Sequence, residues 1–227
     1  MTKTADLRAS LNLEPDARPS AVSPGTTLII EDGFYPDPDR IRREALQMEY
    51  GPKEGGNYAG RNATRRVLDP EVVERMTTIT GDRFEVKDGE SFGVFRLSVL
   101  DDPYGTFIHS DPVRWGGVLF LNPQPQSIGG TAFWRHRETG LEQLPWDDPQ
   151  RWGFATPLDA WRSLVEEDGN HPERWELVLN IPARYNRLLL FNSRLFHSQM
   201  PYESFGTTAQ TARLVQVFFF TPEPTPA

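Results

Sequence analysis

The stretch Phe92-Gly93-Val94-Phe95-Arg96-Leu97-Ser98-Val99 begins the part of the chain that decides the fold. From here to residue 221, short apolar runs alternate with turn-forming Pro, Gly and Asn residues, a pattern that indicates β-strands. One longer excursion, at residues 137–174, interrupts the pattern and carries a helix near residues 158–167. We expect strands at 92–99, 106–111, 115–121, 131–136, 175–181, 187–191, 195–199 and 212–221.

Two helices are expected before these strands, after a short strand at residues 27–30. Asp37 or Asp39 can cap the first helix, and Asp69-Pro70 can open the second. Apolar residues recur at helical spacing in both, at Ile41, Ala45 and Met48 and at Val72, Val73, Met76 and Ile79. Two helices followed by about eight strands predict a mainly β fold with N-terminal helices and a double-stranded β-helix core, of the jelly-roll or cupin-like kind.

The chain is expected to form one folded domain. Residues 1–25 are polar and without periodicity, which predicts a flexible leader, and residues 26–227 then form a single jelly-roll domain. The Gly-rich segment 51–62 has the conformational freedom to act as a lid. Substrate specificity is expected to lie in loops of this kind.

Composition excludes several classes of function. A net charge of −8 argues against nucleic acid or an anionic membrane surface as partner. No apolar run has the length of a transmembrane helix, and the N-terminus lacks the apolar segment of a signal peptide, so we expect a cytoplasmic protein. Cysteine is absent, which leaves histidines, carboxylates and water as metal ligands. The expected partner is a small molecule or a peptide, and nothing in the sequence indicates an oligomeric state.

Residues 107–111, Phe-Ile-His-Ser-Asp, carry the strongest chemical signal. On a strand, residues i and i+2 point to the same side, so His109 and Asp111 can converge on one metal ion. His197 follows a second apolar run, at residues 188–196, and precedes a turn. Two histidines and one carboxylate form the facial triad that binds non-haem Fe(II). A single histidine is more often structural, and the prediction depends on all three residues.

Several further polar residues are candidates for the same site. Arg213 is the single charged residue of the last apolar strand, where a bound dicarboxylate would compensate for burying its charge. On strand 131–136, either the face of Thr131, Phe133 and Arg135 or the opposite one should point to the pocket. Possible substrate contacts, each with a purely structural alternative, are Arg135, His136, Arg137, Asn122 and Arg114.

The order of these elements along the chain resembles that of the Fe(II)/2-oxoglutarate-dependent dioxygenases, specifically their prolyl-4-hydroxylase-like branch. The resemblance covers residues 27–221 and is carried by His109-Ser110-Asp111, Gly129-Gly130-Thr131-Ala132-Phe133, His197 and Arg213. A small bacterial subgroup with a run like residues 130–137 is also similar. One departure is the long separation between His197 and Arg213.

The resemblance implies a role for each matching residue. His109, Asp111 and His197 would bind Fe(II), and 2-oxoglutarate would chelate the iron with its far carboxylate on Arg213, which leaves a position for O2. Tyr104 stands where the family often places a second contact to the co-substrate, and Arg194 is a weaker substitute for Arg213. Hydroxylation of an unactivated C–H bond in a small molecule or peptide is the implied reaction, with desaturation, cyclisation or epoxidation as variants.

Two other functions stay open at this point. One is a cupin-like metalloenzyme that does not use 2-oxoglutarate, although cupins usually present more histidines than this chain's four. The other is a non-catalytic jelly-roll binding module, for which three intact metal ligands would be superfluous.

Overall fold

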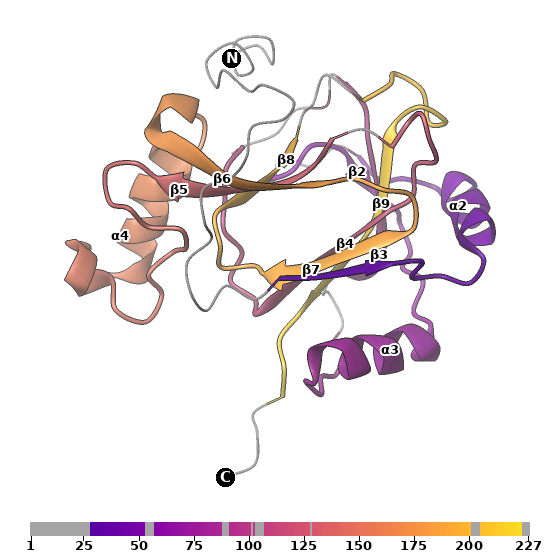
Figure 1. Ribbon diagram of the computed structural model, residues 1–227, viewed down its shortest axis with the longest axis horizontal. Helices are drawn as coiled ribbons and strands as arrows, with labels where there is room; N and C mark the ends of the chain where they lie inside the picture. The colour runs from indigo at the N-terminus through magenta and orange to yellow at the C-terminus, as the bar shows by residue number, and fades with distance from the viewer. Residues whose placement is uncertain are drawn as a thin grey trace.

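Two antiparallel sheets form the centre of the molecule (Figure 1). The computed structural model describes residues 28–52, 57–87, 91–100, 102, 107–127, 129–200 and 205–223. The larger sheet has the order β1-β7-β4-β9-β3-β2, and the smaller has the order β6-β5-β8. The strands are β1 (Leu28–Asp32), β2 (Arg61–Asn62), β3 (Phe92–Ser98), β4 (Trp115–Phe120), β5 (Gly130–His136), β6 (Trp175–Pro182), β7 (Arg187–Asn192), β8 (His197–Met200) and β9 (Arg213–Phe220).

The chain crosses repeatedly between the two sheets. After β4 it enters the smaller sheet for β5 and β6 and returns to the larger sheet for β7. It then crosses to the smaller sheet for β8 and back to the larger sheet for β9. Side chains from both sheets meet in one apolar cluster, which includes Val118, Phe133 and Val217. Two packed antiparallel sheets with this connectivity form a jelly roll. The expected mainly β, double-stranded β-helix fold is confirmed.

The central strand β9 divides its side chains between two environments. Val215 and Val217 pack between the sheets, whereas Leu214, Phe218 and Phe220 pack on the opposite face. This follows from the two-residue repeat of a strand whose faces are both covered. The residues of β9 that point between the sheets, beginning with Arg213, can therefore reach a site inside the jelly roll.

Helices α2 (Pro38–Leu46) and α3 (Pro70–Thr80) cover the outer face of the larger sheet (Figure 1). The carboxylate of Asp37 accepts a hydrogen bond from the backbone of Arg40, and that of Asp69 accepts one from Glu71. Both helices thus begin at the predicted Asp-Pro steps, with Asp37 rather than Asp39 as the cap of the first. The predicted apolar residues of the two helices belong to the core here, at Ile41, Ala45, Met48, Val72, Val73, Met76 and Ile79.

A β-bulge at Gly93 rotates the side chains of β3. The pairing of β3 with β9 shifts register between Phe92 and Val94, and Gly93 has a φ of 76°. The bulge places both Phe92 and Phe95 on the helix-covered face. Arg96 consequently points to the inner face, where it lines the cavities described below.

The outer face of the smaller sheet is covered by the excursion between β5 and β6. Helix α4 (Pro157–Trp161) continues as a π-helical segment, η2 (Arg162–Glu167). Leu164 and Val165 pack there with Trp134 and Trp175. The helix expected near residues 158–167 is confirmed, with its second half more widely wound than an α-helix.

One expected strand is wrong in its described part. Residues 107–111 form bends, with a single antiparallel bridge between His109 and His197. The ladder does not continue, because Pro112 follows and because the backbone N–H of Asp111 donates to the carbonyl of Ser193. The predicted leader 1–25, residues 53–56 of the possible lid, and Tyr104 lie outside the described residues.

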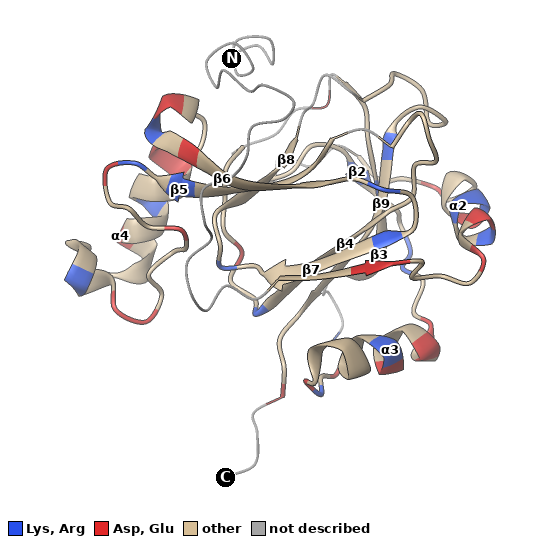
Figure 2. Cartoon of the chain, viewed as in Figure 1, with Lys and Arg blue, Asp and Glu red and all other residues tan. Residues whose placement is uncertain are grey.

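Residues of both charge signs are mixed along the helices and the loops (Figure 2). In the part of the chain that the structure describes, no helix combines the length and the apolar character needed to span a bilayer.

Candidate metal centre and active site

The bridge between His109 and His197 joins two distant parts of the chain. The backbone N–H of His109 donates to the carbonyl of His197 at 3.0 Å, and the backbone N–H of His197 donates to the carbonyl of His109 at 2.8 Å. The two imidazole rings lie 4.5 Å apart between centroids. One pair of hydrogen bonds therefore places both rings at the same point of the smaller sheet.

Both imidazoles are oriented by backbone carbonyls. Nδ1 of His109 lies 3.1 Å from the carbonyl of Phe107, and Nδ1 of His197 lies 2.7 Å from that of Leu195. A carbonyl can only accept, so each Nδ1 carries a proton, and in the neutral form of the ring Nε2 then has a lone pair. This is the arrangement in which a histidine binds a metal ion through Nε2.

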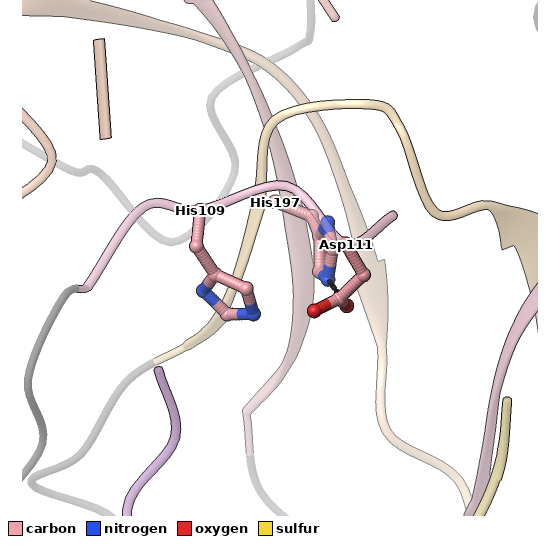
Figure 3. A group of neighbouring side chains, drawn as sticks. All are labelled: His109, Asp111 and His197. Atoms are coloured by element: carbon pink, nitrogen blue, oxygen red, sulfur yellow. Dashed lines mark ion pairs between the residues drawn. The ribbon is translucent and has the colours of Figure 1, made fainter. Parts of the chain in front are cut away.

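Asp111 completes the group (Figure 3). Its Oδ2 atom lies 3.3 Å from Nε2 of His197, yet this oxygen is buried and accepts no hydrogen bond. One ligand atom from each of His109, Asp111 and His197 lies within 4.8 Å of the others. A buried carboxylate oxygen without a donor, beside two imidazole lone pairs, fits a divalent cation.

The protonation states also suit a cation. Desolvation by the surrounding protein lowers the pKa of His109 to about 4, and His197 adds to this effect. Burial alone would raise the pKa of Asp111, but contact with His197 and the electrostatic interaction with His109 outweigh burial and hold it below the usual value. A neutral imidazole and an ionised carboxylate are the forms that bind metals, because protonation blocks the ligand atoms.

Two adjoining cavities reach these side chains. The wide cavity has a volume of about 340 Å³, and its wall includes Arg96, His109, Asp111 and Val113. The narrow cavity, of about 50 Å³, extends between the sheets past His109 and His197 to Arg213. Arg213, 8% exposed, thus lies in the site with the two histidines, as the sequence suggested.

The narrow cavity contains further hydrogen-bonding groups. Thr131 and Gln199 line it beside Arg213. Nε2 of Gln199 is buried and has no acceptor. The face of β5 that points inward is therefore that of Thr131 and Phe133, which resolves the alternative left open by the strand pattern.

The basic run at the end of β5 does not reach the site. Arg135 forms ion pairs with Glu142 and Glu176. His136 is buried against Asp168, with Nε2 3.0 Å from its Oδ2. Nε of Arg137 donates to the carbonyl of Trp175. Neither cavity has Arg135, His136 or Arg137 in its wall. These three residues therefore have the structural role that the sequence left open, and not a role in substrate binding.

The other suggested contacts are also structural. The side chain of Asn122 is hydrogen-bonded to the backbone of Ala212 and Leu214, which joins the end of β4 to β9. The guanidinium of Arg114 stacks on Trp115, with 4.6 Å between its carbon and the ring centre. Arg194 forms an ion pair with Asp147. None of Asn122, Arg114 and Arg194 lines either cavity.

Sequence reasoning missed Arg96, Tyr58 and Gln199. A signal for Arg96 was present, because a glycine within an apolar strand often marks a bulge and a charge in such a strand needs a reason. Tyr58 stands in the Gly-rich segment, where nothing in the pattern distinguishes a cavity wall from an exposed loop. Gln199 is one polar residue in a short strand and gave no signal.

Several solved structures are similar to this chain. A crystal structure described as the non-heme alpha ketoglutarate dependent carbocyclase SnoK from nogalamycin biosynthesis has a TM-score of 0.48 and 12% identity, over 97% of this chain and 86% of that one. The epimerase SnoN, described as dependent on the same compound and from the same pathway, has a TM-score of 0.48 and 14% identity, over 96% and 83%. The Fe(II)/(alpha)ketoglutarate-dependent dioxygenase TqaL has a TM-score of 0.39 and 11% identity, over 96% and 87%. Similarity of this degree carries no activity over to this chain.

Sequence comparison places the chain in a family. A search of curated proteins gave no match. One family model matches residues 14–220, which span both sheets and the three candidate metal ligands His109, Asp111 and His197. The chain belongs to DUF6445, a family of unknown function.

Proposed function

We propose that this protein is an Fe(II)- and 2-oxoglutarate-dependent oxygenase that hydroxylates a C–H bond of a small molecule or peptide. The overall reaction converts substrate, 2-oxoglutarate and O2 into hydroxylated substrate, succinate and CO2. The observation that carries the proposal is the convergence of His109, Asp111 and His197 within 4.8 Å, at the wall of two cavities.

The three side chains would hold the metal on one face only. Two imidazoles and one carboxylate leave further coordination positions, which is the property required for binding a co-substrate and O2 together. Bound iron would supply the redox chemistry that couples decarboxylation of the 2-oxoacid to oxidation of the substrate. The backbone carbonyls of Phe107 and Leu195 keep the two rings in place for this.

The narrow cavity supports a dicarboxylate co-substrate. Arg213 brings a positive charge, and the Gln199 amide and the Thr131 hydroxyl can donate hydrogen bonds. Charge-assisted hydrogen bonds of this kind are about twice as strong as neutral ones. An acid bound there would have one end at Arg213 and the other beside the histidines. A cupin-like enzyme without 2-oxoglutarate would not require a buried arginine at that place.

The order His109, Asp111, His197 and Arg213 along the chain also supports a relationship to the prolyl-4-hydroxylase-like branch. The wide cavity lies beside His109 and Asp111 and is the place we assign to substrate. Hydroxylation is favoured over halogenation, because Asp111 would fill the position at the metal that a halogenase needs for chloride.

The test uses the chromophore of the complex. Fe(II) and 2-oxoglutarate are added to the protein without oxygen, and the metal-to-ligand charge-transfer absorption of the chelate is measured. We expect the band in the wild type and its loss in His109→Ala. The matched control is His171→Ala, since the imidazole of His171 is exposed and pairs with the exposed carboxylate of Glu173. Folded, iron-loaded protein without the band would contradict the proposal.

A further inference from the structure

The wide cavity contains a rigidly held cation. Arg96 is 7% exposed and lines the cavity together with His109 and Asp111. The carbon of its guanidinium lies 3.3 Å from the centre of the Tyr58 ring. Its Nε donates a hydrogen bond of 2.9 Å to Oδ1 of Asn62. A ring face and one edge contact thus fix the plane of the guanidinium.

The two residues that hold Arg96 also hold each other. Nδ2 of Asn62 donates to the Tyr58 hydroxyl at 2.8 Å, and Asn62 pairs directly with Arg96 in the ladder between β2 and β3. Arginine has a large side-chain entropy, so an anion that binds a pre-ordered guanidinium loses less free energy to ordering.

The charge of Arg96 acts on the same space as the metal-binding groups. It contributes to the lowered pKa of His109 and to the lowered pKa of Asp111. A positive charge in a partly enclosed cavity favours an anion there, because the low-dielectric walls screen it less than water does.

The volume and the other lining residues of the wide cavity indicate the size and polarity of its ligand. The volume of about 340 Å³ is at the lower end for small-molecule sites, which span roughly 300–1,000 Å³. Val113, Pro112 and Phe219 make part of the wall apolar. Among the described lining residues, the one carboxylate is that of Asp111, which is assigned to the metal. Among the lining residues that the structure describes, an ammonium group on the ligand would therefore have only Asp111 to pair with.

We propose that Arg96, positioned by Tyr58 and Asn62, binds the carboxylate of a small, mainly aliphatic carboxylic acid without a free ammonium group. Bound in this way, the carbon chain lies along Val113 and Phe219 and reaches the metal-binding side chains. The role of this acid as the substrate rests on the proposed oxygenase function. Its binding to Arg96 does not depend on that function. The proposal narrows the substrate class and makes an unmodified amino acid a poor fit.

The test measures binding without turnover. Zinc-loaded protein, free of 2-oxoglutarate, is titrated calorimetrically with hexanoate, with hexanamide and with norleucine, the analogue that carries an ammonium group. Hexanoate should bind at least about tenfold more tightly than either, equivalent to about 1.4 kcal/mol. In Arg96→Gln the preference for acid over amide should disappear. Arg194→Gln is the matched control, because that arginine pairs with Asp147 away from the cavities.

Three results would overturn the assignment. The first is equal hexanoate affinity in the wild type and in Arg96→Gln. The second is hexanoate binding that requires zinc and ignores Arg96, since the acid would then be a metal ligand. The third is a loss of 2-oxoglutarate affinity in Arg96→Gln as large as the loss for hexanoate, which would assign Arg96 to the co-substrate.

Two positioning variants keep the test decisive if Arg96→Gln does not fold. Tyr58→Leu removes the stacking surface and should weaken the binding of hexanoate. Tyr58→Phe keeps the ring and should bind hexanoate nearly as tightly as the wild type. Equal binding by both variants would overturn the proposal. The calorimetric titration contains neither 2-oxoglutarate nor oxygen, so its result does not depend on the proposed oxygenase function. A missing charge-transfer band in the separate experiment with Fe(II) and 2-oxoglutarate would contradict the oxygenase function alone and leave Arg96-dependent binding of hexanoate intact.

Discussion

His109 and His197 are hydrogen-bonded to each other through their backbones in both directions, at 3.0 and 2.8 Å. The candidate metal site thus lies at β8, the edge strand of the smaller sheet, and the bridge that joins residue 109 to this strand fixes the distance between the two rings. Ligands built on regular backbone pairing are held more rigidly than ligands on free loops. The metal-free protein should therefore already have the site in a binding geometry.

The first prediction concerns the pH dependence of the metal-free protein. His109 has a pKa of about 4 in the folded state, below the ordinary histidine value of 6.5. The unfolded chain therefore binds more protons as the pH falls from 6.5 to 4, and the free energy of unfolding falls by about 3 kcal/mol across this window. Below pH 4 this contribution stays lost.

Urea denaturation in the presence of a chelator, measured across that pH range, tests this dependence. His109→Gln should remove most of it, and His171→Gln, at an exposed site, should leave it unchanged. An unaltered pH slope in His109→Gln would assign the effect to another group.

The second prediction concerns metal binding and stability. A divalent cation that binds only the folded state raises the free energy of unfolding by about 2.7 kcal/mol at a concentration of about 100 Kd. Asp111→Ala removes the buried oxygen that has no other donor, and the stabilisation by Zn(II) at the same concentration should largely vanish. Thermal denaturation with and without zinc measures it. Asp147→Ala, whose side chain is 89% exposed, is the control; stabilisation retained in Asp111→Ala would exclude that residue as a ligand.

The third prediction separates the roles of two arginines. Arg213→Gln should weaken 2-oxoglutarate binding about tenfold or more, because a charge-assisted pair contributes about 1.5–3 kcal/mol. The affinity for the metal should change little, since Arg213 is not among the ligands. Titration of the charge-transfer band with 2-oxoglutarate gives the first affinity, and titration with Fe(II) at saturating 2-oxoglutarate gives the second. Arg194→Gln should behave as the wild type, and a reversed result would restore Arg194 as the co-substrate contact.

The fourth prediction tests the bulge in β3. A Cβ at Gly93 would lie 2.3 Å from the carbonyl oxygen of Val67, and its φ of +76° is unfavourable for other residues. Gly93→Ala should lower the free energy of unfolding by about 2 kcal/mol or more. Gly140→Ala is a matched control, because Gly140 has a φ of +72° and nothing within 4 Å of an added Cβ. It should cost about 1 kcal/mol, and equal losses in chemical denaturation would show that the contact with Val67 does not matter.

Much of the fold could be predicted because a strand that is buried on both faces is apolar along nearly its whole length. The run at 187–191 and the run at 212–221 are apolar nearly throughout, and both correspond to central strands of the larger sheet. The segment at 107–111 contains only two apolar residues, Phe107 and Ile108, and forms one bridge. Its pairing depends on where Ser193 and His197 lie in space, and local sequence carries no record of that.

The site was predictable to the extent that its residues share a chemical type. His109, Asp111 and His197 stand out as metal ligands wherever the fold places them. Arg96 depends instead on a shift of one residue in the register of β3, and such a shift exchanges the two faces of a strand. Arg135 shows the reverse case, since its partners Glu142 and Glu176 come from segments whose positions only the fold determines.

The alternation along β9 has a consequence for how this protein can vary. Arg213, Val217 and Phe219 line the cavities, whereas Leu214 and Phe218 pack under the helices. Substitutions at the first set change the walls of the cavities and leave the helix-covered core in place, whereas substitutions at the second set change that core and leave the cavity walls in place. Of the inward positions, Val217 is fully buried between the sheets and Arg213 is assigned to the co-substrate. Phe219 is only partly buried, so it is the position of this strand at which a directed-evolution library would sample new substrates at the least cost to folding.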